Sequence, residues 1–74
     1  MENNYELEEI EERTRTGYVM TYKYYKVLNY DGNEERLKEY VKKLNDESMF
    51  NIDYYIDKID YNEVIIEEIE DTLD

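Results

Sequence analysis

The chain has 74 residues, of which 21 are acidic and 9 are basic, so its formal net charge is −12. It contains no Cys and no His, which excludes disulfides, thiol catalysis and Cys-based zinc sites, and removes the commonest general base. Its length predicts a single acidic domain, residues 1–74, with a small core.

The N-terminal part of the chain is expected to form an antiparallel hairpin. Residues 18–28 are rich in aromatic and β-branched side chains, which is typical of a strand. Alternation divides that strand into two faces: Tyr18, Met20, Tyr22 and Tyr24 on one, and Val19, Thr21, Lys23, Tyr25 and Val27 on the other. Residues 5–12 should pair with it after a turn near residues 14–17. Ile10 breaks the alternation there, and either a bulge or a short helix explains this.

Residues 34–45 are predicted to form a helix. The apolar side chains follow the i, i+3, i+4, i+7 spacing of one buried stripe: Leu37, Tyr40, Val41 and Leu44. Asp31 or Asn33 can cap its start, and the acidic residues that follow suit the positive end of the helix dipole. Lys42 and Lys43 suit the other end.

Residues 49–71 fit two interpretations. Phe50, Ile52, Tyr54 and Ile56 alternate as on a strand, whereas Ile52, Tyr55, Ile56 and Ile59 have helical spacing, and residues 64–69 are equally ambiguous. The density of Ile, Tyr and Val favours strands, and residues 60–62 favour a turn between them. The prediction is therefore an α+β fold of order ββαββ, a small antiparallel sheet with one helix packed on a face. A helical C-terminal half is the alternative.

The acidity lies at the two ends of the chain. Residues 1–12 contain six acidic residues and no base, and residues 44–74 contain eleven acidic residues and one base, while the middle is mildly basic. Such a protein is attracted to basic surfaces, most of which hold nucleic acid. We expect the two ends to fold together into one phosphate-like negative field, with carboxylates on alternate strand residues about 6.6 Å apart. The alternative is a solvated face that keeps the domain soluble.

Ten tyrosines are divided between core and interface. Those expected to fill the core are Tyr22, Tyr24, Tyr40 and Tyr54. Those expected to anchor a partner are Tyr25, Tyr55 and Tyr61, because Tyr is enriched at interface hot spots and its ring also accepts an Arg cation. A base-stacking role requires a basic groove, which this chain lacks.

Catalytic residues, cofactors and metal ions are not predicted. Residues 57–63 lack the Gly and the correctly spaced Glu of an EF-hand loop. There is no phosphate-binding Gly loop, and no nucleophile–base pair can be formed without Cys or His. The chain is therefore expected to be a binding protein and not an enzyme.

In size, charge and lack of catalytic residues the chain resembles the anti-CRISPR proteins, small acidic phage proteins that inhibit RNA-guided Cas nucleases, several of them as DNA mimics. The acidic residues of 2–12 and 46–74 carry the resemblance, which includes no signature motif. It implies a non-enzymatic inhibitor of a Cas effector complex, acting in the cytoplasm of the host cell if the protein is phage-encoded. No signal peptide or membrane segment is visible.

The expected contact residues are acids and tyrosines of the C-terminal hairpin: Asp53, Tyr55, Asp57, Tyr61, Glu67, Glu68, Glu70 and Asp71. They would bind the basic nucleic-acid-binding groove of the partner. The alternative function is a small protein-interaction module, such as an antitoxin or an assembly protein, that binds through a Tyr-rich apolar face and can form a homodimer.

Overall fold

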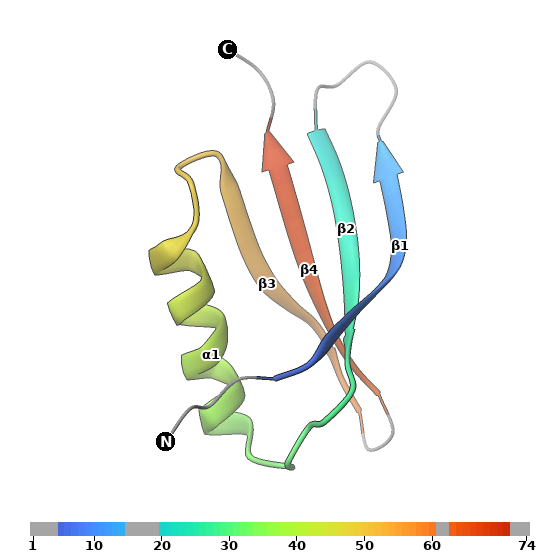
Figure 1. The fold of residues 1–74 in the computed structure, drawn as a ribbon, viewed down its shortest axis with the longest axis vertical. Coiled ribbons are helices and arrows are strands. Elements are labelled where there is room, and N and C mark those ends of the chain that lie inside the picture. The colour runs from blue at the N-terminus through green and yellow to red at the C-terminus, as the bar shows by residue number, and fades with distance from the viewer. Residues whose placement is uncertain (1–4, 15–19, 61–62, 72–74) are drawn as a thin grey trace.

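The computed structural model describes residues 5–14, 20–60 and 63–71. Its elements, in chain order, are β1 (Leu7–Thr14), β2 (Met20–Val27), α1 (Glu34–Glu47), β3 (Ile52–Ile59) and β4 (Val64–Asp71). The four strands form an antiparallel sheet in the order β1-β2-β4-β3, and α1 packs beside β3 (Figure 1). The predicted α+β class and the ββαββ order are confirmed, and the helical alternative for the C-terminal half is wrong.

The hairpin of β1 and β2 contains the irregularity expected at Ile10. Glu9 lies opposite Tyr25 and Glu11 lies opposite Tyr24, so Ile10 is one extra residue in β1. This is a β-bulge, and it moves the residues that follow it to the opposite alternation. Residues 15–17 of the expected turn, and Tyr18 and Val19, lie outside the described residues.

The helix begins at Asn33, whose Oδ1 accepts the backbone N–H of Arg36 at 3.0 Å. Asp31 braces the same turn, since its carboxylate accepts the hydroxyl of Tyr5 at 3.0 Å and the guanidinium of Arg36 at 2.9 Å. The helix ends at Glu47, two residues beyond the predicted end, so its last turn contains acidic residues and not the predicted lysines.

The core lies between α1, the sheet and the segment before β1. Its buried side chains come from all three parts: Tyr5, Val27, Leu37, Val41, Val64 and Ile66. Leu37 and Ile66 are fully buried. Tyr40 and Tyr54 pack against this core, as predicted. Tyr22 and Tyr24 do not belong to it, so their predicted core role is wrong. Because they alternate with the core residue Val27, they point to the other face of the sheet.

Side-chain hydrogen bonds from the end of α1 tie the helix to the outer edge of β3. Oδ1 of Asn45 accepts the N–H of Tyr54 at 2.7 Å, and its Nδ2 donates to the C=O of Tyr54 at 3.0 Å. Ser48 Oγ donates to the C=O of Ile52 at 3.0 Å. The N–H of Ile52 donates to the C=O of Met49 at 3.0 Å, so residues 49–51 form a turn.

Phe50 therefore precedes β3 and is 99% exposed. The prediction that Phe50 belongs to the alternating strand is wrong, because the turn over residues 49–51 precedes the first strand residue, Ile52. Ile52, Tyr54 and Ile56 follow the predicted alternation, since Tyr54 and Ile56 pack on the core.

Truncation of the buried helix stripe should destabilise the domain. Leu37→Ala leaves a cavity at a fully buried site and should lower the free energy of unfolding by about 2–5 kcal/mol. Leu28→Ala is the matched control, because Leu28 is 52% exposed. Urea denaturation of both variants measures the difference, and an equal loss in both would contradict the assigned core.

Candidate protein interface

One face of the sheet points toward α1, and the opposite face carries no helix from residues 5–14, 20–60 or 63–71. Because Tyr54 and Ile56 pack on the core, the strand residues that alternate with them point away from α1. Strand pairing extends this assignment across the sheet. The helix-free face consists of Glu8, Glu11, Arg13, Met20, Tyr22, Tyr24, Lys26, Asp53, Tyr55, Lys58, Ile65, Glu67, Ile69 and Asp71.

The predicted contact residues are divided between the two faces. Asp53, Tyr55, Glu67 and Asp71 belong to the helix-free face, and Asp57 lies beside it. Glu68 and Glu70 point to the helix side, and Tyr61 lies outside the described residues. The prediction of one continuous negative field is therefore wrong. Consecutive residues of a strand point in opposite directions, so Glu67 and Glu68 cannot share a face.

Carboxylates on the helix-free face are more widely spaced than phosphates. Tyr55 separates Asp53 from Asp57, and Ile69 separates Glu67 from Asp71. Each of these acidic pairs is four residues apart, which is about 13 Å along a strand. One DNA strand places a charge about every 3.4 Å. The face therefore does not reproduce a row of phosphates. What it can bind depends on the individual side chains that it carries.

Carboxylates and tyrosine rings alternate across the middle of the helix-free face. One row crosses all four strands and runs Glu11, Tyr24, Glu67, Tyr55. Tyr24 is engaged within it, since its hydrogen bond to Glu67, together with burial, raises the pKa of the phenol above its ordinary value. Tyr55 is 51% exposed.

The contacts of Arg13 indicate that this row can bind a guanidinium group. Its guanidinium lies over the ring of Tyr24, 5.8 Å from the centroid, and its Nε donates to the carboxylate of Glu11. The hydrogen bond to Glu11 raises the pKa of Arg13. The first half of the row thus holds a guanidinium between a carboxylate and an aromatic ring. In the second half, the side chains of Asp53 and Tyr55 have no hydrogen bond or ion pair among the described residues.

A shallow pocket of about 340 Å³ opens at one end of the helix-free face. Its lining is apolar at Ile10, Tyr24 and Ile65, acidic at Glu11, Asp57 and Glu63, and basic at Arg13. Glu63 is paired with Lys58 at 2.8 Å. Sequence reasoning missed the contribution of Ile10 and Glu11, although the break in alternation at Ile10 was the available signal.

Glu68 has a structural role on the face of the sheet that points toward α1. Its carboxylate accepts the hydroxyl of Tyr54 at 2.6 Å and that of Tyr25 at 3.4 Å. Burial, followed by the charges of Glu68 and Glu9, raises the pKa of Tyr25 to about 12. Burial and the bond to Glu68 raise the pKa of Tyr54 as well. Tyr25, predicted as a partner anchor, is half-buried and engaged with Glu68.

Within the described part of the chain, no group of three or more acidic side chains is arranged to hold a metal ion. Helix α1 has neither the length nor the apolar character needed to cross a bilayer. Comparison with protein-family models, curated proteins and solved structures found no match to this chain.

The raised pKa of Tyr25 and Tyr54 predicts how stability depends on alkaline pH. Their ordinary pKa is about 10, so the unfolded chain releases these protons first, and stability falls as the pH rises from about 10 toward the folded pKa. Glu68→Gln lowers both folded pKa values and should make this decline smaller. Urea denaturation between about pH 9 and about pH 11 measures it. The control is Glu35→Gln, and an unchanged decline in Glu68→Gln would contradict the assignment.

Proposed function

We propose that the protein is a non-enzymatic inhibitor that occupies the basic nucleic-acid-binding groove of another protein through its helix-free face. The resemblance in size and charge suggests a Cas effector complex as that partner, in the cytoplasm of the host cell. The observation that supports the proposal is the row Glu11, Tyr24, Glu67, Tyr55, because its first half already binds the guanidinium of Arg13.

Arginine is the partner residue that suits this row. A guanidinium donates to carboxylates through a planar fork and also stacks on aromatic rings, so carboxylate and tyrosine neighbours satisfy it together. In the second half of the row, Glu67, Tyr55 and the adjacent Asp53 offer the same groups. Nucleic-acid grooves are lined with Arg and Lys placed for phosphates, and a bound acidic face would block access sterically.

The net charge increases the rate of association with a basic partner more than it increases the affinity. A formal charge of −12 steers the protein toward a basic groove, whereas exposed ion pairs contribute little each. The tyrosines therefore have to supply the apolar contact that keeps the complex together.

A small protein-interaction module, such as an antitoxin or an assembly protein, is the second candidate. It is favoured by a Tyr-lined apolar groove between α1 and β3, which contains Val41, Tyr54, Tyr55 and Ile56. Under this function the apolar contact would be primary and the acidic side chains would be solvated.

An oligo-arginine peptide should bind the helix-free face more tightly than an oligo-lysine peptide of equal length. The pair Asp53→Asn and Glu67→Gln should weaken arginine binding roughly twofold to thirtyfold, since each exposed pair contributes about 0.2–1 kcal/mol. The affinity should also fall steeply with added salt. Amide chemical shifts and isothermal titration calorimetry measure both effects.

The matched control removes the same charge from the outer side of α1, with Glu35→Gln and Glu39→Gln, which are both exposed. It should change the affinity less than about twofold, because exposed charges far from the site are screened. An equal loss in the two double variants would show a response to net charge alone and would contradict a role for the helix-free face.

Order of addition tests the inhibitory role with purified, guide-loaded Cas nucleases. Protein added before the DNA should prevent DNA binding, and protein added after the DNA should have little effect, because both ligands compete for one groove. Gel-shift and cleavage assays report the two outcomes. Inhibition that is independent of the order of addition would contradict occupation of the DNA groove.

A further inference from the structure

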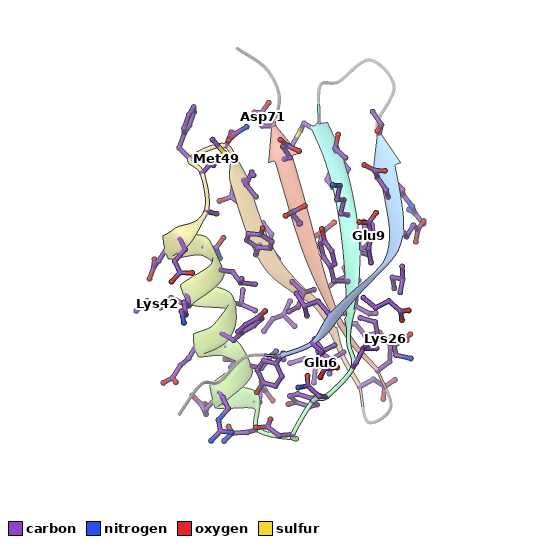
Figure 2. All side chains as sticks on the ribbon, in the orientation of Figure 1. Glu6, Glu9, Lys26, Lys42, Met49 and Asp71 are labelled. Atoms are coloured by element: carbon purple, nitrogen blue, oxygen red, sulfur yellow. The ribbon has the colours of Figure 1, made fainter. Side chains whose placement is uncertain are left out.

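The turn between α1 and β3 exposes two large apolar side chains on a fixed backbone. Met49 is 67% exposed and Phe50 is 99% exposed. The backbone around them is held by hydrogen bonds, since Asn51 and Asp71 exchange two bonds of 2.9 Å and Ser48 bonds to Ile52. Figure 2 shows Met49 and Asp71 at the same end of the molecule. Large apolar groups presented on a pinned turn are typical of contact residues, because little conformational entropy is lost on binding.

The last turn of α1 beside Phe50 contradicts the charge preference of a helix. Asp46 and Glu47 occupy it, and no basic residue does. Carboxylates at this end lie close to the negative pole of the helix dipole and destabilise the helix. Such local conflicts are concentrated at functional sites. The exposed turn is thus an apolar projection with an acidic flank.

Between α1 and β3 lies a groove that is apolar and has a basic flank, whereas the exposed turn has an acidic flank. It is shallow and open, with a volume of about 350 Å³, and its lining includes Val41, Tyr54, Tyr55 and Ile56 and, on the α1 side, Lys38 and Lys42. Lys38 is paired with Glu34 at 3.3 Å, whereas the ammonium group of Lys42 has no hydrogen bond or ion pair among the described residues. The groove therefore suits an apolar side chain with an acidic neighbour.

We propose that the protein forms a two-fold symmetric homodimer in which Phe50 of each protomer enters the groove of its partner. The projection and the groove lie along one side of the molecule, where Lys42 and Met49 are seen in Figure 2. Lys42 lies within α1, five residues before its end at Glu47, and Phe50 lies in the turn, three residues beyond that end. A two-fold axis near Asn45 places two α1 helices antiparallel, so each projection reaches the opposite groove and Asp46 approaches Lys42 of the other protomer.

The small net charge of α1 suits self-association on this side of the molecule. With a net charge of −12 the protomers repel each other, but α1 itself contains five acidic and four basic residues. A domain of this size also gains stability from a second copy. The dimer goes beyond the proposed function, and it leaves Glu11, Tyr24 and Glu67 accessible while it covers part of Tyr55.

Sedimentation velocity over a concentration series tests the dimer. The unaltered protein should shift from monomer to dimer, and Phe50→Ser should raise the dimer dissociation constant at least about tenfold, as expected for a central aromatic contact. Leu28→Ser is the matched control, because it removes an exposed apolar side chain outside the proposed interface. A protein that stays monomeric at all concentrations, or a Phe50→Ser variant that dimerises as well as the unaltered protein, would overturn the proposal.

A charge exchange tests the register. Lys42→Glu and Asp46→Lys should each weaken the dimer, and the double variant should restore it, because the opposite charges face each other again in both copies. Circular dichroism confirms that each variant is folded. Failure of the double variant to recover would overturn the two-fold arrangement. The oligo-arginine titration of Phe50→Ser separates the two proposals, because loss of the dimer uncovers Tyr55 and should not weaken arginine binding by Glu67 and Asp53, whereas failure of the proposed function leaves the dimer intact.

Discussion

The packing of one helix stripe against one half of a sheet determines the rest of this structure. Leu37 and Val41 of α1, with Val64 and Ile66 of β4, form most of a core that is small for four strands. The helix lies beside β3 and leaves the β1 side of the sheet to the N-terminal segment, where Tyr5 packs edge-on to Tyr40 at 5.1 Å. One helix cannot cover both faces, so the second face has to be stable in water.

Tyrosine side chains make both faces of the sheet stable in water. A phenol ring covers apolar surface while its hydroxyl remains solvated or bonded, so it suits a sheet that is only partly buried. On the helix side, Tyr25 and Tyr54 share the carboxylate of Glu68. On the helix-free face, Tyr24 meets Glu67. The excess of acids and the excess of tyrosines are therefore one feature, since the carboxylates accept the hydroxyls, and both are available to a cationic partner.

Periodicity and composition together predicted the elements, but they located the ends of the elements less well. The apolar spacing around Leu37 and the alternation around Tyr54 are local signals, and both agree with the structure. The start of β3 depends on side-chain hydrogen bonds from Asn45 and Ser48, which periodicity does not contain, and Phe50 was misplaced for this reason. The site was predicted in part. The division of Glu67 from Glu68 follows from strand alternation alone, whereas the addition of Glu11 depends on the strand order and on the bulge at Ile10.

The bond pair between Asn45 and Tyr54 has a consequence for the behaviour of the protein in concentrated solution. An open sheet has two outer strands whose backbone groups can template another chain, and fibres grow from such strands. On β3 the Asn45 amide already occupies the donor and the acceptor of Tyr54. On β1 the four glutamates between Leu7 and Arg13 repel an identical strand. Lateral growth of the sheet is thus opposed at both edges, by a side-chain amide at Tyr54 on β3 and by like charge on β1.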